Sequence, residues 1–180
     1  MILGFSTKFP KGKGILSNTE THFPERVIRS LTIPEYKKMI LFDLFYKTKH
    51  EDEWLSLSRF QNLSPKKHTI RIDKNNRWNI DREIDFFIGV RTKNMFRFAP
   101  KTKVVSIQSI EIFKVAYVDT PYTVKVNGKC YQVSIDGKCL LKSDIKALAV
   151  NDGFDTVLEF FEWFNEDFSG KIIHWTNLKY

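Results

Sequence analysis

The stretch Tyr-Thr-Val-Lys-Val-Asn-Gly-Lys-Cys-Tyr-Gln-Val-Ser-Ile-Asp-Gly, residues 122–137, indicates a chain rich in β-structure. Two runs of β-branched and aromatic residues flank Asn127-Gly128, a dipeptide that favours the two-residue turn of a β-hairpin. Asp136-Gly137 closes the second run with a turn of the same kind. Together these features predict a meander of short antiparallel strands.

Further strands are predicted on both sides of this meander. Apolar runs rich in β-branched residues occupy residues 2–6, 68–72, 84–90, 95–98, 104–117 and 171–175. Runs of this length and composition are typical of strands. The run 104–117 shifts the phase of its alternation near Ser109, which predicts a bend or a bulge there.

Helices are predicted near both ends of the chain. A short helix over about 24–31 has Asn18 or Thr21 as its candidate cap. Residues 34–47 and 51–60 follow as a helical hairpin, in which the first helix has an apolar face of Tyr36, Ile40, Leu41, Leu44 and Phe45.

Two more helices are expected towards the end of the chain. Ser143 is a candidate N-cap for residues 144–150, and Asn151-Asp152-Gly153 then breaks the helix. Residues 155–165 form the next helix, whose core face is Val157, Phe160, Phe161 and Phe164. Many short strands with few helices predict an α+β fold, a small mixed β-barrel flanked by helices.

The composition of the chain is typical of a single globular domain. The chain has 180 residues and is 42% hydrophobic, which suits one domain over 1–180 with a real core. Cys130 and Cys139 are able to face each other on a hairpin, but free buried thiols are favoured because nothing suggests export. The scattered histidines and the lack of a glycine-rich phosphate loop indicate no metal and no other cofactor.

The sequence shows neither a signal peptide nor a membrane-spanning run. The apolar run at residues 1–6 is too short for a signal peptide. No run approaches the length that spans a membrane. We therefore expect a cytoplasmic protein with no membrane partner.

Charge is distributed unevenly along the chain, whose net charge is +8. Residues 61–103 carry 11 Lys and Arg against 4 Asp and Glu, whereas residues 151–168 carry 6 acids and neither Lys nor Arg. A basic segment favours partners that bear phosphate groups, although it is also common in soluble proteins that bind none.

The most unusual segment is Lys66-Lys67-His68-Thr69-Ile70-Arg71. On a strand, Thr69 and Arg71 point to the same face. A guanidinium beside a hydroxyl binds phosphate or a base edge, and a desolvated lysine can activate the hydroxyl as a nucleophile. The alternative is an edge strand with solubilising charges, and the pattern leaves open whether Lys66 or Lys67 faces the site.

Other candidates have plainer interpretations beside the functional ones. Asp152 is a candidate acid or a partner for a lysine, but also a candidate capping residue. Trp78, next to Arg77, is a candidate for stacking on a base or for a lid over the end of the barrel. His174 is expected to be a half-buried histidine with satisfied hydrogen bonds. The aromatic cluster at 160–164 is expected in the core.

Several segments together indicate a family resemblance: Leu3–Lys13, Thr21–Phe23, Lys67–Arg71, Arg77-Trp78, Gly89–Thr92, Gln108–Ile110, Leu148-Ala149, Asn151–Asp155 and Ile172–Thr176. With these residues the chain resembles the ASCH domains of the PUA-like superfamily, especially the ASCH-type proteins of Bacteroidetes and their phages. The resemblance leaves out roughly residues 32–63, where the family usually has a short turn and this chain is expected to insert the helical hairpin.

The resemblance implies a PUA-like β-barrel and RNA binding. Some ASCH enzymes are acetylcytidine amidohydrolases, and others act as ribonucleases. Matched to the amidohydrolase pattern, Lys66 is the base, Thr69 the nucleophile and Asp152 the acid, although the family has Glu at the last position. Arg71 is then a binding residue.

Three hypotheses follow, with binding ranked above catalysis. The first is an RNA- or nucleotide-binding domain whose contacts are Lys67, Arg71, Arg77, Trp78, Arg91 and Lys93. The second is a hydrolase, either the amidohydrolase or a ribonuclease. The third is a protein-interaction module that uses residues 34–60, with Phe45 and Trp54 exposed on the insertion.

Overall fold

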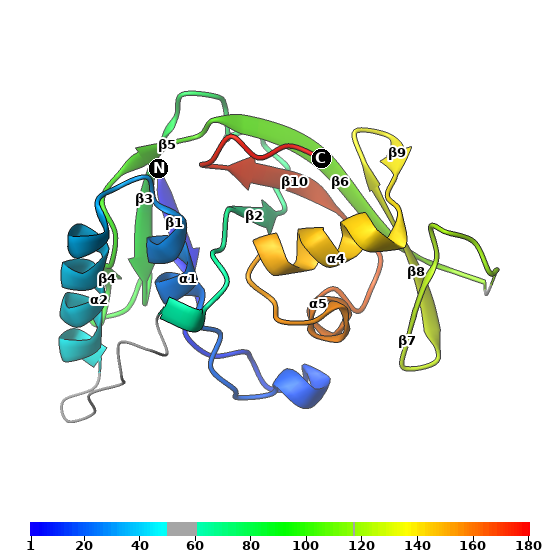
Figure 1. Ribbon diagram of the computed structural model, residues 1–180, viewed down its shortest axis with the longest axis horizontal. Coiled ribbons are helices and arrows are strands. Elements are labelled where there is room, and N and C mark those ends of the chain that lie inside the picture. The colour runs from blue at the N-terminus through cyan, green and yellow to red at the C-terminus, as the bar shows by residue number, and fades with distance from the viewer. Residues whose placement is uncertain (50–60, 117) are drawn as a thin grey trace.

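The computed structural model describes residues 1–49, 61–116 and 118–180 and shows an α+β fold (Figure 1). Its helices are α1 (Phe23–Ser30), α2 (Glu35–Lys49), α4 (Lys142–Asn151) and α5 (Val157–Trp163), with a 3-10 turn at Gly14–Leu16. The α1 and α2 helices lie beside the strands near the N-terminus, and α4 and α5 lie against the larger sheet (Figure 1). None of the described helices has the length and apolar character needed to cross a membrane.

The first sheet gathers strands from the N-terminal half. Its members are β1 (Ile2–Phe5), β3 (Glu83–Ile88), β4 (Phe96–Arg97) and β5 (Thr102–Lys103). The β1 and β3 strands pair in parallel, and β4 and β5 pair antiparallel with β3. The β1 strand therefore forms an edge of this sheet.

The second sheet is antiparallel and has the order β2-β10-β6-β8-β7, with β9 paired to β8. These strands are β2 (His68–Arg71), β10 (Phe168–His174), β6 (Ser106–Val115), β8 (Lys129–Ile135), β7 (Val124–Val126) and β9 (Lys138–Cys139). The short β2 strand, which holds the basic motif, is the edge of this sheet.

The predicted closed barrel is not formed by the described residues, whose strands make two open sheets. At the point where the edges approach, the guanidinium Nη2 of Arg71 on β2 donates to the carbonyl oxygen of Gly4 on β1 at 2.7 Å. A side chain thus takes the acceptor that a backbone ladder would use. The two edges are connected through a side chain rather than through paired strands.

The hairpin turns are confirmed. Asn127 and Gly128 have φ of 47° and 76°, and Asp136 and Gly137 have φ of 49° and 78°, as the type I′ turn requires. The cysteine prediction is partly wrong: both thiols are free, but only Cys130 is buried and Cys139 is exposed.

The bulge predicted near Ser109 is wrong. The β6 strand pairs in continuous register with β10 and then with β8. Its buried face includes Ser106 and Gln108, whose polar side chains concealed the alternation. Gln108 is accommodated because its amide donates to Asp136 and to the carbonyl oxygen of Tyr180.

Helix caps differ from the predictions. His22 is the N-cap of α1, and the Thr21 hydroxyl accepts the Phe23 N–H instead. The α4 helix begins one residue before Ser143, with Leu141 as its N-cap and no side-chain cap. The α5 helix starts later than predicted, at a capping box between Thr156 and Glu159.

The α2 helix buries only part of the predicted apolar face. Phe45 is buried and Leu41 half-buried as predicted, but Tyr36, Ile40 and Leu44 are exposed. The other buried side chains of α2 are Phe42 and Tyr46. The Phe45 ring lies 6.1 Å from that of Phe98 and joins α2 to the first sheet. Phe45 is therefore not the exposed docking residue of the interaction hypothesis, and Trp54, with the helix predicted at 51–60, lies outside the described residues.

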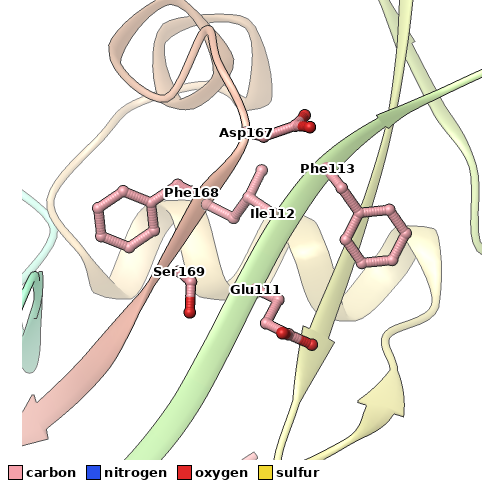
Figure 2. A pocket seen from close by; sticks show the side chains of 6 residues that line it. All are labelled: Glu111, Ile112, Phe113, Asp167, Phe168 and Ser169. Atoms are coloured by element: carbon pink, nitrogen blue, oxygen red, sulfur yellow. The ribbon is translucent and has the colours of Figure 1, made fainter.

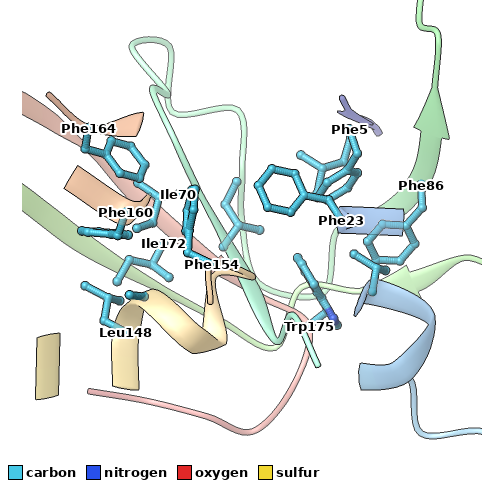
Figure 3. Close-up of a cluster of buried hydrophobic side chains, with 14 of the residues drawn as sticks. Phe5, Phe23, Ile70, Phe86, Leu148, Phe154, Phe160, Phe164, Ile172 and Trp175 are labelled. Carbon is cyan, nitrogen blue, oxygen red and sulfur yellow. The ribbon is translucent and has the colours of Figure 1, made fainter. Parts of the chain in front are cut away.

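Aromatic and aliphatic side chains form the core, which extends along both sheets (Figure 3). Phe5, Phe86 and Trp175 lie near the first sheet, and Phe154, Phe160 and Phe164 come from α5 and the segments next to it. The rings of Phe23 and Phe154, with centroids 5.6 Å apart, connect the two groups. This contact forms one wall of the site described next.

Candidate functional site

A small pocket lies where α1, the edge strand β2 and the end of α4 meet. Its volume is about 60 Å³. We call it the inner pocket, and it is lined by Ser6, Phe23, Lys66, Thr69, Ile70, Arg71, Asp152, Phe154 and Trp163. The structure therefore brings together Lys66, Thr69 and Asp152, the three catalytic candidates from the sequence.

The backbone before β2 determines which lysine enters this pocket. The Lys66 N–H donates to the Arg26 carbonyl on α1, and the Lys67 N–H donates to the Asn151 carbonyl on α4. These two bonds fix the segment between the helices. Lys66 faces the pocket and is buried, whereas Lys67 is half-buried and lies outside the lining.

Lys66 and Asp152 form a buried ion pair. The ammonium Nζ lies 2.6 Å from Oδ1 of Asp152 and also donates to the main-chain oxygen of that residue. It sits 4.5 Å from the centre of the Phe23 ring. Burial lowers the pKa of Lys66 to about 8, although Asp152 opposes the shift. At neutral pH a small but useful fraction of the amine is therefore neutral.

Asp152 is not the N-terminal capping residue of the plainer interpretation. It is the C-cap of α4, and Gly153 follows with a φ of +91°. Burial acts to raise the pKa of Asp152, but Lys66 and His68 hold it below its ordinary value. The carboxylate thus stays ionised as the partner of the ammonium.

Thr69 and Arg71 have different surroundings in this pocket. In the described part of the chain, the Thr69 hydroxyl makes no hydrogen bond to another residue, although its side chain is buried. The Arg71 guanidinium lies 5.4 Å from the Phe5 ring, and burial lowers its pKa. Among the described residues no carboxylate forms an ion pair with Arg71, so the pocket carries an excess of positive charge.

Sequence reasoning missed the groups behind Asp152. His68 Nδ1 lies 3.5 Å from Oδ1 of Asp152, and Nε2 lies 2.8 Å from the Tyr180 hydroxyl. That hydroxyl accepts from Asn151 Nδ2, so its own proton is available for Nε2. A neutral His68 then carries its proton on Nδ1, which lies 3.5 Å from Asp152 but makes no hydrogen bond within the described residues. In the sequence, the contact of His68 with Asp152 was indicated only by the place of His68 next to Thr69 in the motif, which puts the two side chains on opposite faces of the β2 strand.

His174 differs from its prediction. It is fully buried, and neither ring nitrogen has a hydrogen-bond partner in the described chain. Its ring lies 5.1 Å from that of His68 on the neighbouring strand. Burial and the His68 ring lower the pKa of His174 to about 3. His174 is therefore a buried neutral residue without satisfied hydrogen bonds.

The remaining nucleic-acid candidates do not gather on one face. Trp78 is buried in the core, so the stacking prediction is wrong, although its edge lines a second cavity with Arg71 and Arg77. Arg91 and Lys93 are exposed on the turn after β3 and line none of the cavities described here.

A wider hollow elsewhere on the molecule has a different character (Figure 2). Its volume is about 350 Å³, and it lies over β6 and the start of β10. Glu111 and Asp167 contribute its charged side chains, so it does not suit a phosphate. We call it the acidic hollow, and it contains none of the candidates from the sequence.

These features define an α+β domain with a buried lysine–aspartate pair and a threonine in one pocket. Within the described ranges, no group of three or more His, Cys, Asp and Glu side chains is placed to hold a metal ion. No protein-family model, no curated protein and no solved structure matches this chain.

Proposed function

We propose that the chain is an ASCH-type amidohydrolase that removes the acetyl group from an acetylated cytidine. One observation supports this proposal most directly: Lys66, Thr69 and Asp152 line a single pocket. The same proposal includes a PUA-like fold. The edges at β1 and β2, connected through Arg71 and Gly4, are compatible with a barrel opened along that line.

The proposed reaction begins with Lys66. Its neutral amine accepts the Thr69 proton as the hydroxyl oxygen attacks the amide carbonyl of the substrate. Arg71 stabilises the negative charge that develops on the carbonyl oxygen. The Lys66 ammonium then protonates the departing amine of cytidine, and an acetyl-threonine ester remains.

Water completes the cycle. The neutral Lys66 amine accepts a proton from a water molecule, which attacks the ester and releases acetate, and the proton returns to Thr69. The net reaction consumes acetylcytidine and water and yields cytidine and acetate. In this scheme Asp152 remains a carboxylate that stabilises the Lys66 ammonium, rather than the proton donor that the resemblance implies, because its pKa is held low.

The test uses threonine variants. Incubation with acetylated cytidine should release acetate, and Thr69→Ala should lower the rate by at least about a thousandfold, as loss of a nucleophile does. Thr69→Ser should retain part of the activity because it keeps the hydroxyl. Thr32→Ala, at an exposed position, is the matched control. Unchanged turnover in Thr69→Ala would reject the proposal.

RNA or nucleotide binding without catalysis is the second candidate. The unpaired, largely buried Arg71 favours it, together with the basic surplus of residues 61–103. It predicts binding to RNA that weakens steeply as salt increases. A chain that hydrolyses nothing but shows this salt dependence would support this candidate instead.

A further inference from the structure

A second cavity adjoins the inner pocket at Arg71. Its volume is about 200 Å³, and we call it the outer cavity. It lies between β1 and the segment that follows β2. Arg71 and Arg77 supply the charged side chains of its lining, and no carboxylate lines it. Arg71 is common to both cavities.

Arg71 is half-buried, and no carboxylate among the described residues forms an ion pair with it. One guanidinium nitrogen bonds to the Gly4 carbonyl, but Nε is buried without a hydrogen-bond partner in the described residues. A buried charge is costly unless an opposite charge is paired with it. An anion from outside the chain would therefore bind favourably beside Arg71.

Asp73, two residues after Arg71 in the chain, is already occupied. Asp73 accepts the N–H groups of Arg77 and Trp78 at 2.9 Å and 3.1 Å, and Lys171 lies 3.6 Å away. Its carboxylate is buried and does not line the outer cavity. Because the Arg77 N–H is held by Asp73, the start of the Arg77 side chain is fixed at the rim of the cavity.

We propose that the outer cavity is a phosphate subsite, so that the substrate is a nucleotide rather than a free nucleoside. This inference rests on the proposed function: the acetyl group of the base enters the inner pocket beside Thr69, and the phosphate lies between Arg71 and Arg77. Two guanidinium groups offer the forked donors that phosphate oxygens accept. The acidic hollow, with Glu111 and Asp167, would repel the same group.

The phosphate can belong to a mononucleotide or to an RNA strand, and turnover separates the two. The experiment compares kcat/KM for acetylcytidine, its 5′-monophosphate and a short RNA that contains the modified base. We expect either phosphorylated substrate to exceed the nucleoside by about tenfold or more, as for one charge-assisted hydrogen bond. Preference for the RNA alone would assign the phosphate to a strand.

Arg77→Ala tests the subsite itself. The ratio of kcat/KM between the 5′-monophosphate and the nucleoside should fall to near one. Lys146→Ala, which removes an exposed cation on α4 outside all three cavities, should leave the ratio unchanged. If the wild-type protein hydrolyses the nucleoside and the nucleotides equally well, the subsite is overturned while the proposed function stands.

A binding measurement keeps the two proposals separate. Titration calorimetry with cytidine 5′-monophosphate and with cytidine requires no turnover. Tighter binding of the monophosphate, weakened about tenfold by Arg77→Ala, supports the subsite even if no acetylated substrate is hydrolysed. Equal binding of the two ligands, or binding unaffected by Arg77→Ala, overturns it.

Discussion

The ammonium Nζ of Lys66 lies 2.6 Å from Oδ1 of Asp152, and both side chains are almost completely enclosed. These residues are separated by 86 positions in the chain. A buried ion pair is a weak source of stability, because removing two charges from water costs much of what their attraction returns. The proposed reaction gives it a role beside an unbonded threonine, because burial lets the amine release its proton near neutral pH while Asp152 stabilises the ammonium.

The pH dependence of turnover should report on Lys66. Because burial lowers its pKa to about 8, kcat/KM should rise with pH and level off above about 8 as the neutral amine forms. Asp152→Asn removes the charge that opposes this shift, so the inflection should move to lower pH. Asp144→Asn, exposed on α4, is the control. An inflection that stays in place in Asp152→Asn would exclude Lys66 as the base.

Breaking the ion pair should reduce stability more than removing it. Lys66→Met leaves the Asp152 carboxylate buried without its cation, and we expect a loss of about 3–5 kcal/mol in the free energy of unfolding. The double variant Lys66→Met/Asp152→Asn should lose less than the sum of the single variants, because it leaves no buried charge without its partner. Urea unfolding of all four proteins measures this coupling. Strict additivity would mean that the two charges do not interact.

Local patterns in the sequence predicted the parts of the fold that local rules determine. Asn127-Gly128 and Asp136-Gly137 form turns because these residues tolerate positive φ. Thr69 and Arg71 both reach the inner pocket, as the period of a strand requires. The rule that the buried face of a strand is apolar failed for β6. Gln108 lies on that face because its amide donates hydrogen bonds to Asp136 and Tyr180, which are distant in sequence.

Contacts between residues distant in the chain could not be predicted from local sequence patterns. Nothing local indicates that Tyr180 meets His68 or that a guanidinium connects β1 to β2. The α2 helix is apolar on more than one side, so its periodicity did not distinguish the buried Phe42 from the exposed Ile40. The position of Asp152 followed from the family resemblance, whereas its ionised state depends on the groups that surround it.

Tyr180→Phe should alter the proton position on His68. Without the hydroxyl, Nε2 has no donor to accept from, and the ring no longer needs to carry its proton on Nδ1. The Nδ1–H then no longer has to face Asp152, and because that contact is 3.5 Å long, kcat should fall by at most about tenfold, the effect of a full hydrogen bond to a charged group. Nitrogen NMR of the imidazole identifies the tautomer. Tyr122→Phe, at an exposed tyrosine, should change neither the spectrum nor kcat.

Acid should destabilise the fold through His174. Its pKa is lowered to about 3 in the folded chain, below its ordinary value of 6.5, so the unfolded chain binds the proton first. Stability is therefore fully present above about pH 6.5 and decreases as the pH falls, by about 2 kcal/mol at pH 5. His174→Leu should reduce this slope in urea unfolding at pH 5 and pH 8. An unchanged slope would show that other groups cause the loss.

Gly153 connects backbone conformation to the site. Its φ of +91° disfavours any side chain, and an added Cβ would lie 3.1 Å from the Phe23 ring and 3.2 Å from Cδ of Lys66. Gly153→Ala should therefore cost about 1–3 kcal/mol of stability from strain alone and should displace the amine from Asp152. Gly128→Ala is the matched control, because Gly128 has a φ of +76° but nothing within 4 Å of an added Cβ. Both variants incur backbone strain, but only Gly153→Ala should shift the pH inflection of turnover. If both lose stability equally and neither shifts the inflection, the contact with Lys66 has no part in setting the pKa of the amine.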